Sequence, residues 1–409
     1  LTLQFDALRP AALDRRLPAM SLTGPVTVQL RGLPAPGAPT PATQPVATVT
    51  GTLDGRLDTP RASAASPAVQ LVVDADLSRQ ALVLRQARAT AGEASATLAG
   101  ELGFGPGAGG LPLQWKAQGQ LKEFDPLLWF PGAAPAGPRG PTRLNAQLDG
   151  SGRITEPGTL RGWAGQVAVQ LRPSQWAGVP LQGELNAGHV EGRTGTLAAR
   201  AEAAGNRLAL DLQDASDGLA GQATATLDAP AMAALAPLWA SLPEPLRAWL
   251  PRGGAAQGSA TGKWPADTPA AVEWQADVKA SGLQSPRWRA DSLSAQALGR
   301  GWGDDALSVT VDAARLEADG AKLDTLHAEL RGSLREHQFN LQAASPLRPP
   351  AWAENLLGTH GGSGSRMQLV ASGRWLPDPT GSGRWEGRIS RLQGQAGDGT
   401  GQPWLAAQD

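Results

Sequence analysis

The strongest constraint on this chain is a period-two alternation of apolar and polar side chains, which is clearest across residues 196–227. Three alternating segments follow one another there, with the pair Gly205–Asn206 between the first two. Such a pair is typical of a two-residue hairpin turn, because both residues tolerate positive φ. Since side chains alternate between the two faces of a strand, we predict a meander with one apolar and one polar face. A turn at that pair would match apolar with apolar residues: Ala203 with Leu208, Ala201 with Leu210 and Ala199 with Leu212.

The same alternation recurs along most of the chain and is separated by Gly, Asp, Asn and Pro, which predicts antiparallel meander structure. Helix is expected only in a few short segments with Pro near the start: 9–17, 125–130, 228–250 and 350–357. In the third segment Pro243 and Pro245 break the helical pattern, so we expect two short helices there. The spacing of these segments predicts loose sub-units of about 1–124, 125–228, 229–349 and 350–409.

The apolar side chains are too small for a compact sandwich. Ile154 and Ile389 are the only isoleucines, and the chain has 5 Phe, no Tyr and 51 Gly. A sandwich fills its core with large side chains from two sheets, whereas many inward positions here are Ala or Gly. We therefore predict an all-β fold in which one long, twisted, mostly antiparallel meander sheet folds into a U-shaped groove (a β-taco). An open apolar groove is an interaction site, and acyl chains are its expected occupants.

Composition also limits the classes of partner and cofactor. The net charge is -1 and no basic or acidic block is present, so nucleic acid is not an expected partner. The absence of Cys excludes disulfides and Cys-ligated metals. No apolar run approaches the roughly 18 residues that span a bilayer. The chain opens directly into a strand pattern without an initiator Met, and we expect it to be an internal fragment of a longer protein.

No catalytic, metal or cofactor site is predicted. The four histidines, His189, His327, His337 and His360, lack the spacing of paired ligands. We expect His327 to be a solvated side chain on the polar face of its strand. A match to G-x-G-x-x-G at 105–110 lacks the following helix that a dinucleotide site needs, and is interpreted as a loop.

Five tryptophans fall in phase with the apolar face: Trp115, Trp163, Trp274, Trp375 and Trp385. One interpretation is that they line the groove or close its ends. The other is ordinary core filling, with the indole N–H bonded near the rim.

Several sequence segments resemble proteins of the TamB family, the AsmA-like, repeating-β-groove proteins of Gram-negative envelopes. The first is a Trp-bearing strand followed by Leu121-Lys-Glu-Phe-Asp-Pro-Leu-Leu-Trp-Phe-Pro-Gly and then by Arg143-Leu-Asn-Ala-Gln-Leu-Asp-Gly. The segments 229–250 with 258–264, 346–352 with the strand to Trp375, and 383–392 are similar to the same family. The resemblance covers most of the chain and rests on repeated strand–turn phrases.

This resemblance implies a periplasmic groove between the two membranes that carries phospholipid and has no enzymatic activity. It also implies an Omp85-type (TamA-like) outer-membrane barrel as partner and an inner-membrane anchor, both through regions outside this fragment. The expected function is therefore bridge-like lipid transport, and a charge at Leu210 is expected to block it. The expected lining residues are Val167, Val169, Leu171, Leu197, Leu208, Leu210, Leu212, Leu227, Leu330, Leu341, Met367 and Leu369.

The main alternative is a scaffold whose sheet edges template the strands of outer-membrane or autotransporter clients. A β-helical adhesin would show shorter and more regular repeats, which the sequence lacks. A glycan-cleaving enzyme would gather acidic residues in a cleft, whereas the acids here are scattered over polar faces.

Overall fold

A computed structural model describes residues 1–14, 17–30, 46–58, 67–106, 111–130, 140–156, 162–190, 195–215, 220–265, 271–301, 306–333, 335–348, 364–376, 383–397 and 403–408. The predicted fold class is confirmed: in this part of the chain, 22 strands form an antiparallel meander sheet that is not closed, with a few short helices. The U-shaped folding of the whole sheet stays a prediction.

The chain divides into two compact units, which are described in turn. Unit 1 is mainly Leu1–Ala204, and unit 2 comprises Gly205–Asp214, Leu219–Trp239 and Pro243–Asp409. The four predicted sub-units stay a prediction.

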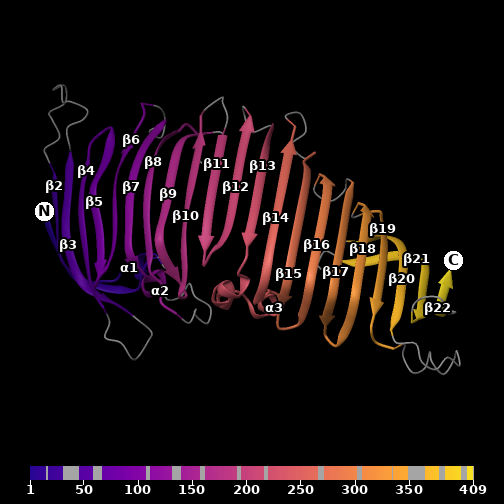
Figure 1. Ribbon diagram of the computed structural model, residues 1–409. Helices are drawn as coiled ribbons and strands as arrows, with labels where there is room; N and C mark the ends of the chain where they lie inside the picture. The colour runs from indigo at the N-terminus through magenta and orange to yellow at the C-terminus, as the bar shows by residue number, and fades with distance from the viewer. Residues whose placement is uncertain are drawn as a thin grey trace. The chain divides into compact units, whose positions relative to one another are not determined.

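Unit 1 runs from indigo to magenta in Figure 1, and its described residues include the helices α1 (Pro10–Leu13) and α2 (Pro126–Trp129). Its strands pair in chain order, each antiparallel to the next. They are β1 (Thr2–Leu8), β2 (Met20–Leu30), β3 (Ala47–Leu57), β4 (Ala68–Leu77), β5 (Ala81–Ala91), β6 (Ala94–Gly103), β7 (Leu113–Phe124), β8 (Leu144–Ile154), β9 (Trp163–Trp176), β10 (Val179–His189) and β11 (Gly195–Ala203).

Unit 2 carries the 3₁₀ helix η4 (Met232–Ser241) and the helix α3 (Glu244–Arg247). From β13 onward each strand pairs antiparallel with the next. The strands are β12 (Asn206–Ala215), β13 (Ala220–Ala229), β14 (Gly253–Trp264), β15 (Glu273–Gln284), β16 (Trp288–Arg300), β17 (Leu307–Ala318), β18 (Ala321–Gly332), β19 (His337–Ser345), β20 (Ser365–Leu376), β21 (Arg384–Ala396) and β22 (Pro403–Gln408).

Tight turns with a glycine at the second position direct the meander. Asp319–Gly320 joins β17 to β18, and both residues have positive φ, 46° and 88°. That combination gives a turn whose twist matches the flanking strands. The predicted turn at Gly205–Asn206 is wrong by one residue, because positive φ falls on Ala204 (47°) and Gly205 (80°) and β12 begins at Asn206.

Asn206 is unavailable for the turn because its side chain is engaged elsewhere. It is 5 % exposed, and its amide bonds both backbone groups of Ala231. Nδ2 donates to the carbonyl at 3.1 Å and Oδ1 accepts from the N–H at 3.0 Å. The pair fixes the start of β12 to the chain that enters η4.

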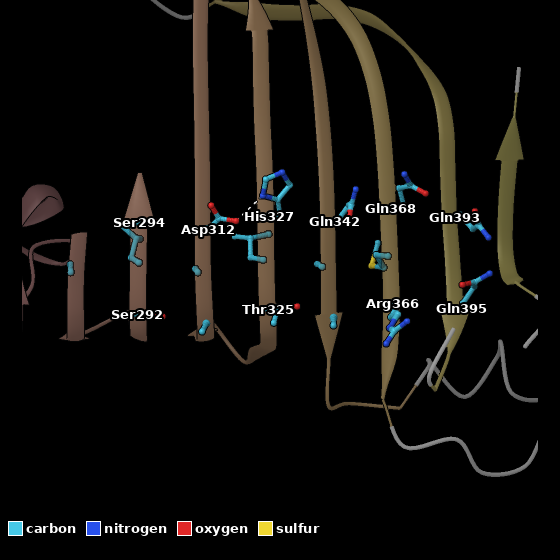
Figure 2. A pocket seen from close by; sticks show the side chains of 18 of the residues that line it. Ser292, Ser294, Asp312, Thr325, His327, Gln342, Arg366, Gln368, Gln393 and Gln395 are labelled. Carbon is cyan, nitrogen blue, oxygen red and sulfur yellow. Dashed lines mark hydrogen bonds and ion pairs between the residues drawn. The ribbon is translucent and has the colours of Figure 1, made fainter. Parts of the chain in front are cut away.

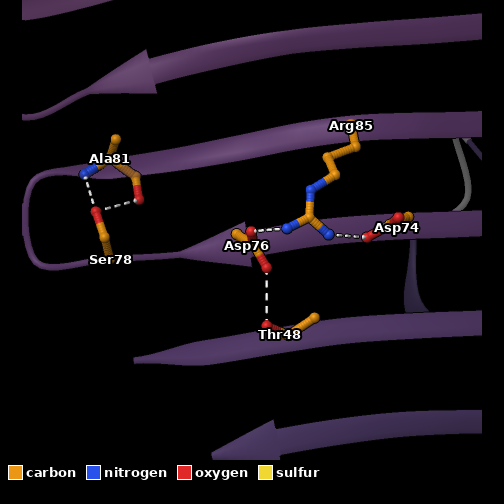
Figure 3. A network of polar contacts seen from close by, with 6 residues as sticks. All are labelled: Thr48, Asp74, Asp76, Ser78, Ala81 and Arg85. Atoms are coloured by element: carbon orange, nitrogen blue, oxygen red, sulfur yellow. Dashed lines mark hydrogen bonds and ion pairs between the residues drawn. The ribbon is translucent and has the colours of Figure 1, made fainter. Parts of the chain in front are cut away.

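A bulge in β5 produces a partly buried polar network on the polar face of unit 1 (Figure 3). Asp74 pairs with Gln86 but Ala75 pairs with Leu84, so Arg85 has no partner position on β4. Its guanidinium bonds Asp74 at 3.0 Å and also contacts Asp76. Asp76 accepts a further bond from Thr48 Oγ1 at 2.8 Å. The bulge thus lets one arginine pair with two carboxylates, one of which belongs to a residue that is 9 % exposed.

The core of unit 1 gathers where α2 covers the end of the apolar face. Asp125 caps α2 by accepting from Leu127 N at 3.0 Å, and Pro126 starts the helix. Trp129 is thereby inserted against Phe124, with ring centroids 5.5 Å apart. Trp129 is 3 % exposed, and the buried residues clustered with it are Met20, Leu22, Leu57, Val69 and Ala91.

The other predicted helices are partly reproduced. α1 is shorter than the predicted 9–17, and 228–250 divides into η4 and α3 as expected, with the first piece a 3₁₀ helix that begins after β13. The segment 350–357 lies outside the described residues. Among the helices that the structure describes, none has the length and apolarity to cross a bilayer.

Candidate functional site

The register of unit 1 aligns apolar side chains into rows that run across the strands on one face. Each row is a chain of directly paired residues. Two neighbouring rows carry the largest side chains. The first is Gly51, Val73, Ala87, Leu98, Gly119, Leu148 and Val169, and the second is Leu53, Leu71, Ala89, Ala96, Leu121, Ala146 and Leu171.

A cavity of about 590 Å³ lies over these two rows, from β4 to β9. Its wall is almost entirely hydrocarbon, and it is open to solvent, since Leu98 is 44 % exposed and Val73 is 37 % exposed. Large apolar side chains grouped in an exposed hollow are uncommon on soluble proteins unless something binds there.

Large and small side chains alternate along the first row, so the surface of the cavity is uneven. Ala87 and Gly119 flank Leu98, and Leu148 follows Gly119 on the next strand. Neighbouring strands lie about 4.8 Å apart, so the leucines of this row stand as separate ridges over a floor of small residues. The hollow therefore runs across the strands and suits a flexible, unbranched apolar chain.

One end of the hollow is closed by the core of unit 1. Leu71 and Ala89 line the cavity and also pack against the buried cluster that contains Trp129. The α2 helix thus covers the apolar face beside the cavity and leaves the rest of the two rows open.

Unit 2 also carries apolar rows on one face of its strands. The longest consists of Leu227, Gly258, Val278, Ala295, Val311, Ala328, Leu341, Leu369, Leu392 and Ala407. A parallel row includes Val309, Leu330, Phe339, Ala371 and Ile389. Ile389 is 47 % exposed, so this face is also incompletely covered by the described residues.

Tryptophans near the strand ends lie flat over glycines of the neighbouring strand. A β-carbon on Gly299 would come within 2.4 Å of the Trp274 indole, and one on Gly373 of β20 within 2.5 Å of the Trp385 indole on β21. Trp115 covers Gly150 and Gly152 in the same way. In the sequence, the tryptophans are interpreted either as lining the groove or as ordinary core filling. These three contacts are packing within the sheet, which agrees with the second interpretation.

The predicted lining residues are distributed over both units. Val167, Val169, Leu171 and Leu197 lie in apolar rows of unit 1, and Val169 borders the cavity. Leu227, Leu330, Leu341, Met367 and Leu369 lie in apolar rows of unit 2, where Leu341 and Leu369 are paired directly. Leu208, Leu210 and Leu212 lie on β12, and Leu208 is 51 % exposed.

The residues that line most of the cavity were not among the predicted ones. The same period-two alternation includes these residues and assigns them to the apolar face, but it does not single them out: Leu71, Val73, Leu98, Leu121 and Leu148. What the sequence does not show is the strand register that brings these residues together at one hollow.

The histidines take part in local contacts. His327 Nδ1 lies 2.7 Å from Asp312 Oδ1 on the polar face, and His337 Nε2 accepts from Trp385 Nε1 at 2.7 Å. His189 stacks on Trp163, and His360 lies outside the described residues. Within the described ranges no group of three His, Asp or Glu side chains is arranged to hold a metal ion.

No family model, curated protein or solved structure matches this chain.

Proposed function

We propose that this chain is a non-enzymatic lipid-transfer protein whose apolar face carries phospholipid acyl chains. The observation that carries the proposal is the open hydrocarbon cavity over β4 to β9, which contains half-exposed Leu98 and Val73. Covering a leucine or valine side chain fully is worth roughly 1.5–3 kcal/mol. An acyl chain lying along the two rows would supply that cover without any specific polar contact.

The mechanism is passive. Because the hollow runs across the strands, a methylene chain can shift from one ridge to the next while it stays in contact with apolar side chains. The headgroup remains in water at the open side, so no charged group has to enter the cavity. Direction would come from whatever loads and removes lipid.

The resemblance to the TamB family suggests where such a conduit works. We infer a periplasmic location between the inner and outer membranes, with an Omp85-type outer-membrane barrel as partner through other parts of the protein. These inferences rest on the resemblance, whereas the acyl-chain proposal rests on the cavity.

Site-specific photo-crosslinking tests the proposal. A benzoylphenylalanine placed at Leu98 or Leu148 should capture phospholipid in a Gram-negative host, detected by mass spectrometry of the purified adduct. The same probe at Asp149 is the matched control, because Asp149 follows Leu148 on β8 and faces the polar side. Equal lipid labelling at Leu148 and Asp149, or no lipid at any site, would refute the proposal.

A charge substitution gives a second readout. Leu98→Asp places a carboxylate against the acyl chain, and we expect co-purifying phospholipid to fall about tenfold or more, the equivalent of 1.4 kcal/mol. Ala99→Asp is the control, because it adds the same charge to the same strand on the opposite face. Both variants should retain the β-sheet circular dichroism of the unmodified protein.

A further inference from the structure

The polar face of unit 2 contains a second cavity, of about 800 Å³, spread over the seven strands from β15 to β21 (Figure 2). It is separate from the apolar cavity, since every residue that lines it belongs to unit 2. Two rows of polar side chains border it, and Leu326 and Met367 lie between the two rows along their strands, with their side chains on the opposite face. In the sequence, only the polar alternation itself points to this hollow.

The first row presents one polar group on every strand. Gln342, Gln368 and Gln393 are directly paired on β19, β20 and β21. His327 and Asp312 continue the row on β18 and β17. The remaining members, on β16 and β15, are Ser294 and Lys279. The second row is shorter and includes Ser292, Thr325, Arg366 and Gln395.

The three glutamines have their amides free for a ligand. Among the residues that the structure describes, none of the three side chains makes a hydrogen bond, although they occupy adjacent positions. Each amide offers two donors and an acceptor. Because neighbouring strands are about 4.8 Å apart, the row repeats this donor–acceptor set at a regular interval close to the length of one sugar ring.

The charged side chains that line the cavity carry a net positive charge. Asp312 is held by His327, with Nδ1 and Oδ1 2.7 Å apart, and it is the only carboxylate among the described lining residues. Lys279 and Arg366 both line the cavity, and neither has an ion-pair partner in the described part of the chain. The free charges of the site therefore favour an anionic ligand.

We propose that this polar cavity binds an extended, anionic glycan that lies across the strands. Each sugar residue carries several hydroxyl groups that donate and accept, which is what a row of amides and hydroxyls satisfies. The acidic groups of the glycan would pair with Lys279 and Arg366. An acidic peptide is less well matched, because an extended backbone alternates its polar groups between two edges and would leave half of them facing away from the row.

Fluorescence anisotropy with the full chain tests this site. The probe is a fluorescein-labelled oligogalacturonate long enough to cross seven strands, with maltooligosaccharide and polyglutamate of similar length as comparisons. We expect saturable binding of the oligogalacturonate, with maltooligosaccharide at least about tenfold weaker, as the loss of 1.4 kcal/mol from charge pairing would give. Equal affinity for maltooligosaccharide, or equal or tighter binding of polyglutamate, would overturn the proposal.

Two substitutions localise the binding. Gln368→Ala should weaken the oligogalacturonate about five- to tenfold, because a hydrogen bond to a ligand of this kind is worth roughly 1 kcal/mol. Arg366→Ala should weaken it by a similar factor and reduce its salt dependence. Gln338→Ala is the control, because Gln338 is exposed on β19 but does not line the cavity. Absence of saturable binding, or equal affinity of the Gln368 and Gln338 variants, would overturn the proposal.

Discussion

The indole of Trp274 on β15 covers Gly299 on β16, and its Nε1 donates to the carbonyl of Gly301 at 3.2 Å. A β-carbon built on Gly299 would lie 2.4 Å from two carbons of the indole ring. The contact is side chain against backbone, so the glycine is needed for the ring to lie flat on the sheet. The same relation holds for Trp385 on β21 over Gly373 on β20.

We expect Gly299→Ala to lower the free energy of unfolding by about 1–3 kcal/mol, because the ring must leave its rotamer or the strands must separate. Urea denaturation followed by tryptophan fluorescence measures it. Gly262→Ala is the matched control: Gly262 pairs with Trp274 from the other side, yet its β-carbon would meet nothing within 4 Å. Equal destabilisation by the two alanines would contradict this account.

A second prediction concerns Trp129, the residue through which α2 covers the apolar face of unit 1. Trp129→Ala removes a side chain that is 3 % exposed and stacked on Phe124, so we expect a loss of about 3–5 kcal/mol in unfolding free energy. Phe130→Ala, at the next position, removes a side chain that is 38 % exposed and should cost far less. Denaturant midpoints compare the two. A smaller effect at Trp129 than at Phe130 would show that α2 does not anchor the core.

The alternation in the sequence was sufficient to predict the strands, because it reports which face each side chain takes. It could not place the turn at Ala204–Gly205. Asparagine suits such a turn as well as glycine does, and only the contact with Ala231 shows that Asn206 is engaged elsewhere. The bulge at Arg85 could not be predicted either, because the carboxylates that Arg85 contacts, Asp74 and Asp76, lie on another strand.

The sites were less predictable than the strands. Of the residues predicted to line a groove, Val169 borders the apolar cavity. Leu98 and Leu148 also border it but are not among the predicted residues, because nothing local distinguishes a leucine in a hollow from one on a flat part of the same face. The polar cavity depends on Gln342, Gln368 and Gln393 meeting in register across three strands, which are separated by loops whose lengths do not reveal the pairing.

A third prediction tests the bond between Asn206 and Ala231. Asn206→Ala would leave the N–H of Ala231 without its partner and would remove one of two donors to the Ala231 carbonyl, which also accepts from Ala234 N, at a site where Asn206 is 5 % exposed. Orphaned groups of this kind cost about 1–3 kcal/mol, so the midpoint of urea unfolding should fall measurably. Asn186→Ala is the control, because Asn186 is exposed on β10. Equal midpoints for the two variants would contradict the inferred role.

The last prediction concerns Glu317 on β17, whose carboxylate lies 2.6 Å from Arg289 and 3.7 Å from Lys322. The hydrogen bond and charge of Arg289 lower the pKa of Glu317 below its ordinary value of 4.5. A lowered pKa in the folded state means that the pair contributes stability above the unfolded pKa and loses it as the pH falls through the folded pKa.

In an NMR titration of the carboxyl carbon, Arg289→Gln should move the Glu317 midpoint upward. Added salt should have the same direction of effect in the unmodified protein, because the pair is exposed. Arg300→Gln, which removes the partner of Glu273 instead, should leave the Glu317 midpoint unchanged. A Glu317 midpoint that is identical in the unmodified protein and in the Arg289 variant would show that the contact does not persist in solution.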